Sequence, residues 1–370
     1  MSRLWLRVDV ALRRFLLRPR VDVPLLLGLL ALMATGLFFL SSAADLAWRT
    51  IGAQALRFAI GFALLLGIAR VPPAQFRRWT PWLYLSSVLM LVLVLLAGEG
   101  SGADRWLNLG IVRFQPSELL KLTMPMMVAW FLAQRPLPPS WRDMAVVLLL
   151  IAIPALLIAK QPDLGTAMLV VAAGGFALFL SGLTWRRIGL MFALLTLLAP
   201  LAWHHMHDYQ RERVLTLLNP ESDPLGTGWH IIQSEIAVGS GGVFGKGFMR
   251  GTQAQLEFLP EHTTDFIFAV VGEEFGLVGV TLLLAIYLFV IGRSLWIAVN
   301  ARDTYARLLG GSLALSFFVY VLVNGGMISG LLPVVGVPLP LVSYGGTSAV
   351  SLLAGFGMLM SIHAHRKLMR

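Results

Sequence analysis

Residues Leu259–Gly276 read LPEHTTDFIFAVVGEEFG and join a long polar, glycine-rich segment to an apolar stretch that continues to Ile291. An apolar stretch of that length predicts a helix that crosses a lipid bilayer. Asp265 lies at the boundary, where a carboxylate is costly unless something in the protein uses it. These residues therefore indicate a membrane protein and give the first candidate for chemistry.

The composition excludes a soluble domain. Of 370 residues, 57% are apolar and only 13% are charged, and the mean hydropathy is +0.78. Apolar runs of roughly 17 to 25 residues recur along the chain, which predicts a polytopic, all-α membrane protein. The short alternating strands of a membrane barrel are missing from the sequence. The chain has no cysteine, so it has no disulfide framework.

We predict about ten transmembrane helices. The basic residues set their orientation: of the 29 Lys and Arg residues, 19 fall in predicted cytoplasmic segments, 8 in outer segments and 2 within spans. Both termini are therefore expected in the cytoplasm, and the net charge of +10 suits anionic lipid headgroups better than nucleic acid. The predicted spans are Pro24–Leu40, Gln54–Ile68, Pro81–Ala97, Ser117–Ala133, Met144–Ala159, Gly165–Leu180, Ile188–Trp203, Phe266–Ile291 with a break near Gly272–Gly276, Leu308–Ile328 and Ser343–Ser361.

The spans form a single transmembrane domain over residues 1–370. Residues 1–20 carry six arginines and predict either a basic interfacial helix or a disordered basic tail. Residues 204–264 form one large extracytoplasmic loop. Its glycine-rich part, Gly239–Gly247, is not a nucleotide-binding P-loop, because Ser240 replaces the first glycine and Gly247 follows the lysine.

Three charged residues lie within or at the rim of apolar spans: Arg57, Glu118 and Lys121. Charged side chains inside a membrane are costly, so we treat each one as a candidate functional residue. Glu118 and Lys121 are three apart on one helix, so they form either a structural ion pair or part of a site. Arg57 has no evident partner on its own helix, which favours an anionic ligand or a carboxylate such as Glu118 on a neighbouring helix.

The shorter outer loop contributes Arg105 and Arg113 beside Trp106 and Phe114. The planar guanidinium suits a diphosphate, and aromatic faces suit sugar rings. An aromatic belt with flanking arginines at the membrane surface explains the same pattern.

Asp265 is either the N-cap of the following helix or a base at the mouth of an outward cavity. Glu273 and Glu274 follow about 12 Å further along a helix and are poorly placed to form a dyad with it. His204 and His207, with Asp208, are poor candidates for a metal site, since histidines at the membrane surface are common.

The segment Asn324–Gly346, NGGMISGLLPVVGVPLPLVSYGG, makes a poor continuous helix. Backbone of this kind at membrane depth must be buried in protein or line a cavity.

Five stretches together make the chain resemble the SEDS family of cell-wall polymerases. They follow the family's order and spacing over most of the chain, and the first hundred residues are the least specific part. The stretches are RWLNLGIVRFQPSELLKL (Arg105–Leu122), QPDLGTA (Gln161–Ala167), DYQRERVLTLLNPESDPLGTGWHIIQSEIAVGSGG (Asp208–Gly242), FLPEHTTDFIFAVVGEEFGLVG (Phe258–Gly279) and GLLPVVGVPLPLVSYGGTS (Gly330–Ser348).

The resemblance implies a peptidoglycan glycosyltransferase of the bacterial cytoplasmic membrane. It would polymerise lipid II with inversion and work with a class B penicillin-binding protein. The family's essential aspartate falls on Asp265, and its paired charges fall on Glu118 and Lys121. His262 departs from the family pattern, which often has Arg-His-Thr before the aspartate.

In this interpretation Asp265 is the base for the acceptor hydroxyl. The leaving diphosphate would bind Arg57, Arg105 and Lys121, with or without a divalent cation such as Mg²⁺ or Mn²⁺. Two alternatives are a lipid II flippase, suggested by the intramembrane charges and broken helices, and a non-catalytic scaffold of the elongation machinery.

Overall fold

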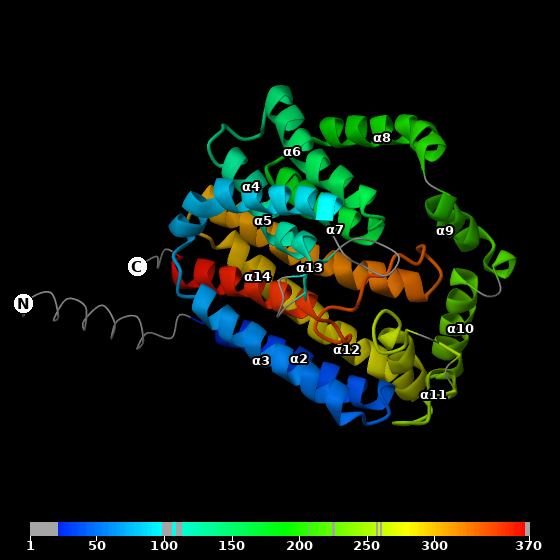
Figure 1. The fold of residues 1–370 in the computed structure, drawn as a ribbon. Helices are drawn as coiled ribbons and strands as arrows, with labels where there is room; N and C mark the ends of the chain where they lie inside the picture. Colours follow the sequence, from blue (N-terminus) through cyan, green and yellow to red (C-terminus); the bar gives the residue numbers. More distant parts are fainter. Residues whose placement is uncertain are drawn as a thin grey trace, which may run out of the picture.

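The protein is a bundle of long helices (Figure 1). The computed structural model describes residues 21–97, 106–108, 113–206, 208–223, 226–256, 258–259 and 261–366. The basic segment 1–20, with its two predicted forms, lies outside these residues. The long helices are α2 (Val23–Ala43), α3 (Trp48–Ile68), α4 (Pro73–Ala97), α5 (Pro116–Leu132), α6 (Trp141–Lys160), α7 (Leu164–Leu180), α8 (Trp185–His205), α12 (Ile267–Val299), α13 (Thr304–Ile328) and α14 (Thr347–Ala364).

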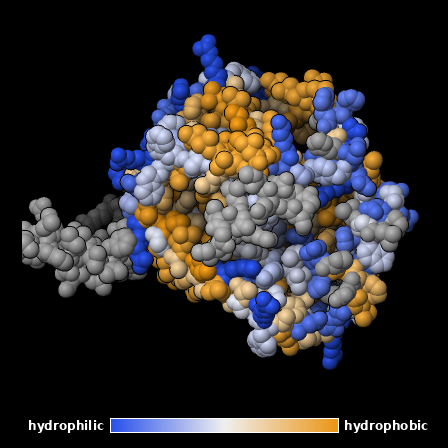
Figure 2. Space-filling model, viewed as in Figure 1, coloured by the Kyte–Doolittle hydropathy of each residue, from blue (hydrophilic) through white to orange (hydrophobic). Residues whose placement is uncertain are grey.

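Each predicted span falls on one of these ten helices, so the prediction of a polytopic all-α fold is confirmed. By length and composition, seven of the described helices can cross a membrane; the other three are α8 and the shorter α5 and α7, which have 17 residues each. Several helices begin earlier than predicted, α3 at Trp48 and α4 at Pro73, because their first turns lie outside the apolar run. Figure 2 shows apolar residues over much of the bundle and hydrophilic residues toward the region of α9 to α11.

Helix starts follow the local sequence. Asp22, Asp163 and Asp303 each accept a hydrogen bond from the backbone N–H three residues ahead, which satisfies an otherwise unpaired donor. Ser140 and Asp143 form a reciprocal capping box at the start of α6. The local sequence therefore determines where these four helices begin.

The predicted break in α12 is confirmed at Gly276, which has φ 60° and ψ −157°. L-residues rarely adopt this conformation. A Cβ at this position would also lie 2.5 Å from the backbone N of Gly245, so no larger residue fits. The kink thus brings the glycine-rich segment against α12, with Leu277 N–H bonded to the carbonyl of Gly242.

The large loop predicted at residues 204–264 contains helices of its own: α9 (Asp208–Leu218), the 3₁₀ turn η1 (Pro220–Ser222), α10 (Thr227–Ser240) and α11 (Thr252–Gln255). Helix α10 packs against α12. The buried carboxylate of Glu273 accepts bonds from Lys246 Nζ at 2.6 Å and from the backbone N–H of Thr252 at 2.8 Å. A short antiparallel pair, β1 (Leu107–Asn108) and β2 (Arg113–Phe114), precedes α5.

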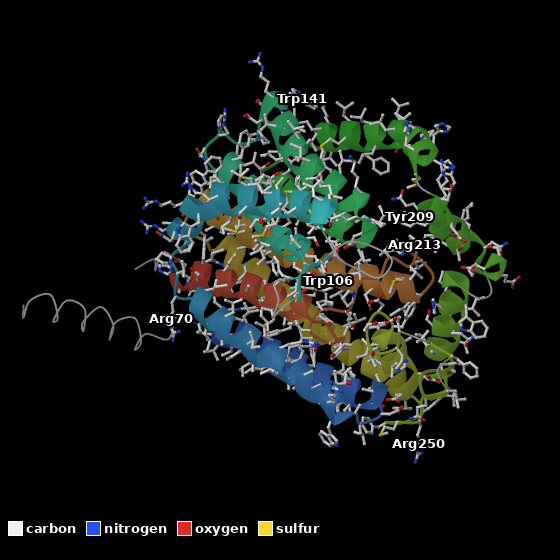
Figure 3. The ribbon with its side chains drawn as sticks, in the orientation of Figure 1. Arg70, Trp106, Trp141, Tyr209, Arg213 and Arg250 are labelled. Atoms are coloured by element: carbon white, nitrogen blue, oxygen red, sulfur yellow. The ribbon has the colours of Figure 1, made fainter. Side chains whose placement is uncertain are left out.

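Both described ends of the chain lie at one end of the bundle. Buried Asp22 accepts bonds from Arg293 Nε at 2.9 Å and from its terminal nitrogen at 2.6 Å, and it lies 3.2 Å from Nδ1 of His363. Figure 3 shows Arg70 near this end and Arg213 and Arg250 at the opposite one. This agrees with an even number of crossings and with the predicted division of basic residues.

Replacing Asp22 with asparagine should lower the midpoint of thermal unfolding in detergent. The change removes the carboxylate that neutralises partly buried Arg293, which costs about 2 kcal/mol for a pair of intermediate burial. Asp208→Asn is the control, because the Asp208–Arg211 pair is exposed and should leave the midpoint unchanged. Equal midpoints for Asp22→Asn and the unchanged protein would contradict this role.

Candidate functional site

A polar cavity of about 180 Å³ lies where α5, α7, α13 and the start of α14 meet. Such a concave site with a few convergent polar groups is the usual place for ligand chemistry. We call it the polar cavity. Its wall includes Trp106, Gln115, Glu118, Lys121, Asp163 and Gly336.

Glu118 and Lys121 form a buried ion pair in this wall. Lys121 Nζ donates to Oε1 of Glu118 at 2.7 Å, and the Ser351 hydroxyl donates to Oε2 at 2.7 Å. The same ammonium lies 5.3 Å from the centre of the Tyr320 ring, close enough for a cation–π contact. The predicted pairing is confirmed, and it leaves a cation facing the cavity.

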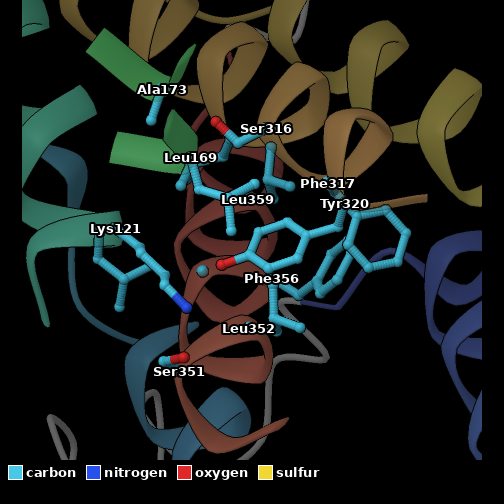
Figure 4. Close-up of a pocket in the computed structure, with 13 residues that line it drawn as sticks. Lys121, Leu169, Ala173, Ser316, Phe317, Tyr320, Ser351, Leu352, Phe356 and Leu359 are labelled. Carbon is cyan, nitrogen blue, oxygen red and sulfur yellow. The ribbon is translucent and has the colours of Figure 1, made fainter. Parts of the chain in front are cut away.

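A second, smaller and mainly apolar cavity of about 30 Å³ adjoins the same residues. Lys121 and Tyr320 line both cavities. Figure 4 shows the Lys121 ammonium and the Tyr320 hydroxyl pointing toward each other, with Ser351 nearby. These side chains therefore form the boundary between the polar cavity and the apolar interior of the bundle.

Asp163 brings a second carboxylate to the polar cavity, and our sequence analysis did not select it. It caps α7 by accepting from the N–H of Thr166 at 3.1 Å, and Gln115 Nε2 donates to its other oxygen at 3.1 Å. The signal was an acidic residue before an apolar span in the QPDLGTA stretch, which resembled an ordinary helix cap. Tyr320 was missed because a tyrosine within a span is common.

Asp265 lies at the rim of the polar cavity rather than in its wall. Its Oδ2 is 3.4 Å from the point where a Cβ on Gly336 would lie, and Gly336 lines the cavity with φ +70°. Only glycine fits this backbone without strain. The structure thus brings Asp265 next to a residue of the cavity that Glu118 and Lys121 line.

Asp265 is not the N-cap of α12. The cap position is Phe266, which provides no side-chain hydrogen bond. Burial and, to a smaller extent, the negative charge of Glu261 raise the pKa of the Asp265 carboxyl to about 6, and Arg213 partly opposes both. A carboxyl with this pKa is ionised near neutral pH but holds a proton more readily than an ordinary aspartate, which suits a general base.

Arg57 has other partners than the ones we expected. Its guanidinium stacks on the Tyr344 ring at 4.4 Å and contacts Gln54 Oε1 at 3.4 Å, whereas Glu118 is paired with Lys121. The idea that Arg57 pairs with Glu118 is therefore wrong. Tyr344 precedes Gly345, a residue of the cavity wall. Arg57 therefore lies behind this wall and contacts it through Tyr344. Arg105 lies outside the described residues.

Within the part of the chain that the structure describes, no group of three or more His, Asp or Glu side chains could hold a metal ion, and His207 lies outside that part. Glu273 and Glu274 are engaged elsewhere, Glu273 with Lys246 and Glu274 with Ser42. They form no dyad with Asp265, as predicted.

Comparison with known proteins gives consistent similarities. The sequence profile of the FtsW, RodA and SpoVE family, described as a cell cycle protein, matches residues 17–368. The chain is 53% identical over 351 residues to the peptidoglycan glycosyltransferase MrdB of Escherichia coli K12, covering 94% of this chain and 95% of that protein.

Two solved structures share the fold. A chain from a peptidoglycan synthase complex, whose study concerns the coordination of polymerization and crosslinking, superposes with a TM-score of 0.82 at 35% identity, covering 94% of this chain and 99% of that one. The rod shape determining protein RodA of Thermus thermophilus gives 0.71 at 30% identity, with 94% and 97% coverage.

The ion pair in the cavity wall should show strong coupling in stability. Lys121→Met should destabilise the protein by about 3 kcal/mol, because it leaves the Glu118 carboxylate buried with only Ser351 as a partner. Adding Glu118→Gln removes the uncompensated charge, so the double variant should recover most of the loss in thermal unfolding in detergent. A double variant as unstable as Lys121→Met alone would show that the two side chains are not coupled.

Proposed function

The chain belongs to the FtsW, RodA and SpoVE family, and we propose that it is a peptidoglycan glycosyltransferase that polymerises lipid II with Asp265 as its base. The observation that carries the proposal is a single carboxylate with a raised pKa at the rim of a polar cavity whose wall holds a cation. The names of the relatives support the class of reaction, and the cavity supports the choice of residues.

The reaction joins a sugar hydroxyl to the anomeric carbon of an α-linked lipid diphosphate and gives a β-linked glycan. Inversion requires a direct displacement, in which the acceptor oxygen bonds to the carbon as the bond to the diphosphate oxygen breaks. The hydroxyl proton goes to the Asp265 carboxylate, and the diphosphate leaves with the bonding electron pair. One base is sufficient, which agrees with the lack of a carboxylate dyad at Asp265.

The leaving diphosphate gains negative charge, so it needs a cation in a site that excludes water. Lys121 supplies this charge in the polar cavity. Its bond to Glu118 and its contact with the Tyr320 ring hold the ammonium in place, so little reorganisation is needed during the reaction. Arg105 remains a proposed contact of the substrate, and Arg57 is proposed to act on the substrate indirectly, through Tyr344.

We propose that the site lies on the outer face of the bacterial cytoplasmic membrane. Asp265 follows the segment of α9 to α11, whose residues Arg213 and Arg250 lie at the end of the bundle opposite Arg70 and the chain ends (Figure 3). The excess of Lys and Arg on the Arg70 side supports a cytoplasmic location for that end. The lipid tail of the substrate would then remain in the bilayer beside the bundle.

The partner we propose is a class B penicillin-binding protein, which supplies the transpeptidase that crosslinks the new strands. The support is the close structural similarity to a chain of a peptidoglycan synthase complex.

The main test is polymerisation of purified lipid II by the purified protein, with and without its penicillin-binding partner. Asp265→Asn should reduce the rate by about 10³-fold or more, because the amide cannot accept the proton. Its thermal unfolding should match that of the unchanged protein, since the two side chains have nearly the same shape.

Glu261→Gln is the matched control, because Glu261 is an exposed carboxylate four residues before Asp265. It should retain polymerisation at neutral pH. Equal rates for Asp265→Asn and the unchanged protein would exclude Asp265 as the base. Translocation of labelled lipid II by liposomes that show no polymerisation would instead support a flippase.

The pH dependence should follow the Asp265 carboxyl. The base works only when ionised, so the rate should rise with pH and reach half its plateau near pH 6, the pKa that burial gives this group. Glu261→Gln removes a negative neighbour, lowers the pKa of Asp265 and should move this limb to lower pH. Initial rates from about pH 5 to about pH 8 give both curves, and a limb that Glu261→Gln leaves in place would contradict the assignment.

A further inference from the structure

The backbone around Asp265 is held by residues that are distant in the sequence. Helix α12 starts just after Asp265 without a side-chain cap, so the local sequence does little to fix this backbone. The carbonyl of Asp265 instead accepts a hydrogen bond from Nδ2 of Asn324, near the end of α13, at 2.8 Å. The position of the proposed base therefore depends on α13.

Asn324 makes a second bond of the same kind. Its Nδ2 also donates at 2.8 Å to the carbonyl of Val337, the residue directly after Gly336. An amide nitrogen carries two N–H donors, so one side chain satisfies both carbonyls. Because Asp265 and Val337 share one amide, Asn324 sets the spacing between the Asp265 backbone and the cavity wall at Gly336.

The burial of Asn324 supports a specific role for this contact. The residue is fully buried, and among the described residues its Oδ1 has no hydrogen-bond partner. A buried, unpaired acceptor is costly, and an apolar residue in the same place would avoid that cost. The two N–H donors are therefore the useful part of this side chain.

Neighbouring contacts restrain the same stretch. The Ser343 hydroxyl donates to the carbonyl of Thr264 and accepts from the N–H of Leu339, and the N–H of Tyr344 donates to the carbonyl of Thr263 at 2.9 Å. Three consecutive carbonyls, from Thr263 to Asp265, are thus held by side-chain or backbone donors of a distant part of the chain. Of these donors, Asn324 also bonds the carbonyl of Val337, the residue next to Gly336.

We propose that Asn324 is a positioning residue, which holds the Asp265 carboxylate at the rim of the polar cavity by bonding the carbonyls of Asp265 and Val337 together. This inference rests on the proposed function. Asn324 itself does not touch the substrate, so its effect should appear in the rate of the chemical step and not in the binding of lipid II.

The test is lipid II polymerisation by Asn324→Ala and Asn324→Leu, with kcat and KM measured separately. Leucine has the same branching as asparagine, and Asn324→Leu loses both N–H donors without opening a cavity or burying a charge, so it remains informative if the alanine variant is unstable. Both changes should lower kcat by about 10-fold to 100-fold, the effect expected from misplacing a reacting group by a fraction of an ångström to an ångström. KM should stay within about 2-fold.

Ser312→Ala is the matched control, because Ser312 is a buried residue of the same helix whose hydroxyl donates to a distant carbonyl, that of Ala173. It should lower the unfolding midpoint but leave kcat per folded protein within about 2-fold. In the Asn324 variants the acid limb of the rate profile should also move to lower pH, since a released Asp265 carboxyl is better hydrated. If the variants only contained less folded protein, the rate would fall by the same factor at every pH, and the acid limb would stay at the same pH.

The outcomes separate the two proposals. If the unchanged protein polymerises lipid II, Asp265→Asn does not, and both Asn324 variants keep the original kcat and acid limb, only the positioning role is overturned. If Asp265→Asn is as active as the unchanged protein, the proposed base fails whatever the Asn324 variants do.

Discussion

The non-helical backbone between α13 and α14 must find hydrogen-bond partners inside the protein, because lipid offers none. It finds them on three sides. Gln54 of α3 donates to the carbonyl of Ser343 and accepts from the N–H of Gly345, both at 3.3 Å. The Tyr287 hydroxyl of α12 donates to the carbonyl of Pro340 at 2.6 Å. The Ser343 hydroxyl and the Tyr344 N–H join this segment to the carbonyls of Thr264 and Thr263. The hydrogen bonds that the segment needs inside a membrane therefore also hold the backbone next to Asp265.

The polar cavity depends on a second constraint, the cost of burying charge. Lys121 and Glu118 offset each other, and Ser351 satisfies a further oxygen, so the pair is stable although little of it is exposed. Asp163 is satisfied by Gln115 and by the start of α7. At Asp265, burial and the negative charge of Glu261 outweigh the attraction of Arg213, so the pKa is raised instead. One carboxyl in the region is thus left with the protonation behaviour of a base.

These two constraints meet at Gly336. A Cβ at Gly336 would lie 3.4 Å from Oδ2 of Asp265, and the neighbouring Val337 shares the Asn324 amide with Asp265. Arg57 approaches the same region from α3 through the Tyr344 ring. The proposed base, the cation of the cavity and the surrounding helices are therefore linked by short contacts, which fits a reaction that depends on placing two sugars and a diphosphate accurately.

The sequence by itself determined the ten long helices, a break near Gly272–Gly276, the three-residue spacing that pairs Glu118 with Lys121, and the selection of Asp265 as a candidate base. Each of these follows from local properties: apolar length, a glycine where the backbone must turn, a three-residue spacing on a helix, and a charge where hydropathy opposes it. Only the tertiary structure decided that Asp265 is no helix cap, that Arg57 stacks on Tyr344, that Asp163 lines the cavity, and that Asn324 holds Asp265. Those contacts join residues far apart in the chain, 289 positions apart for Gln54 and Ser343. Local pattern cannot encode them, because they depend on how close the packed helices bring one backbone to another.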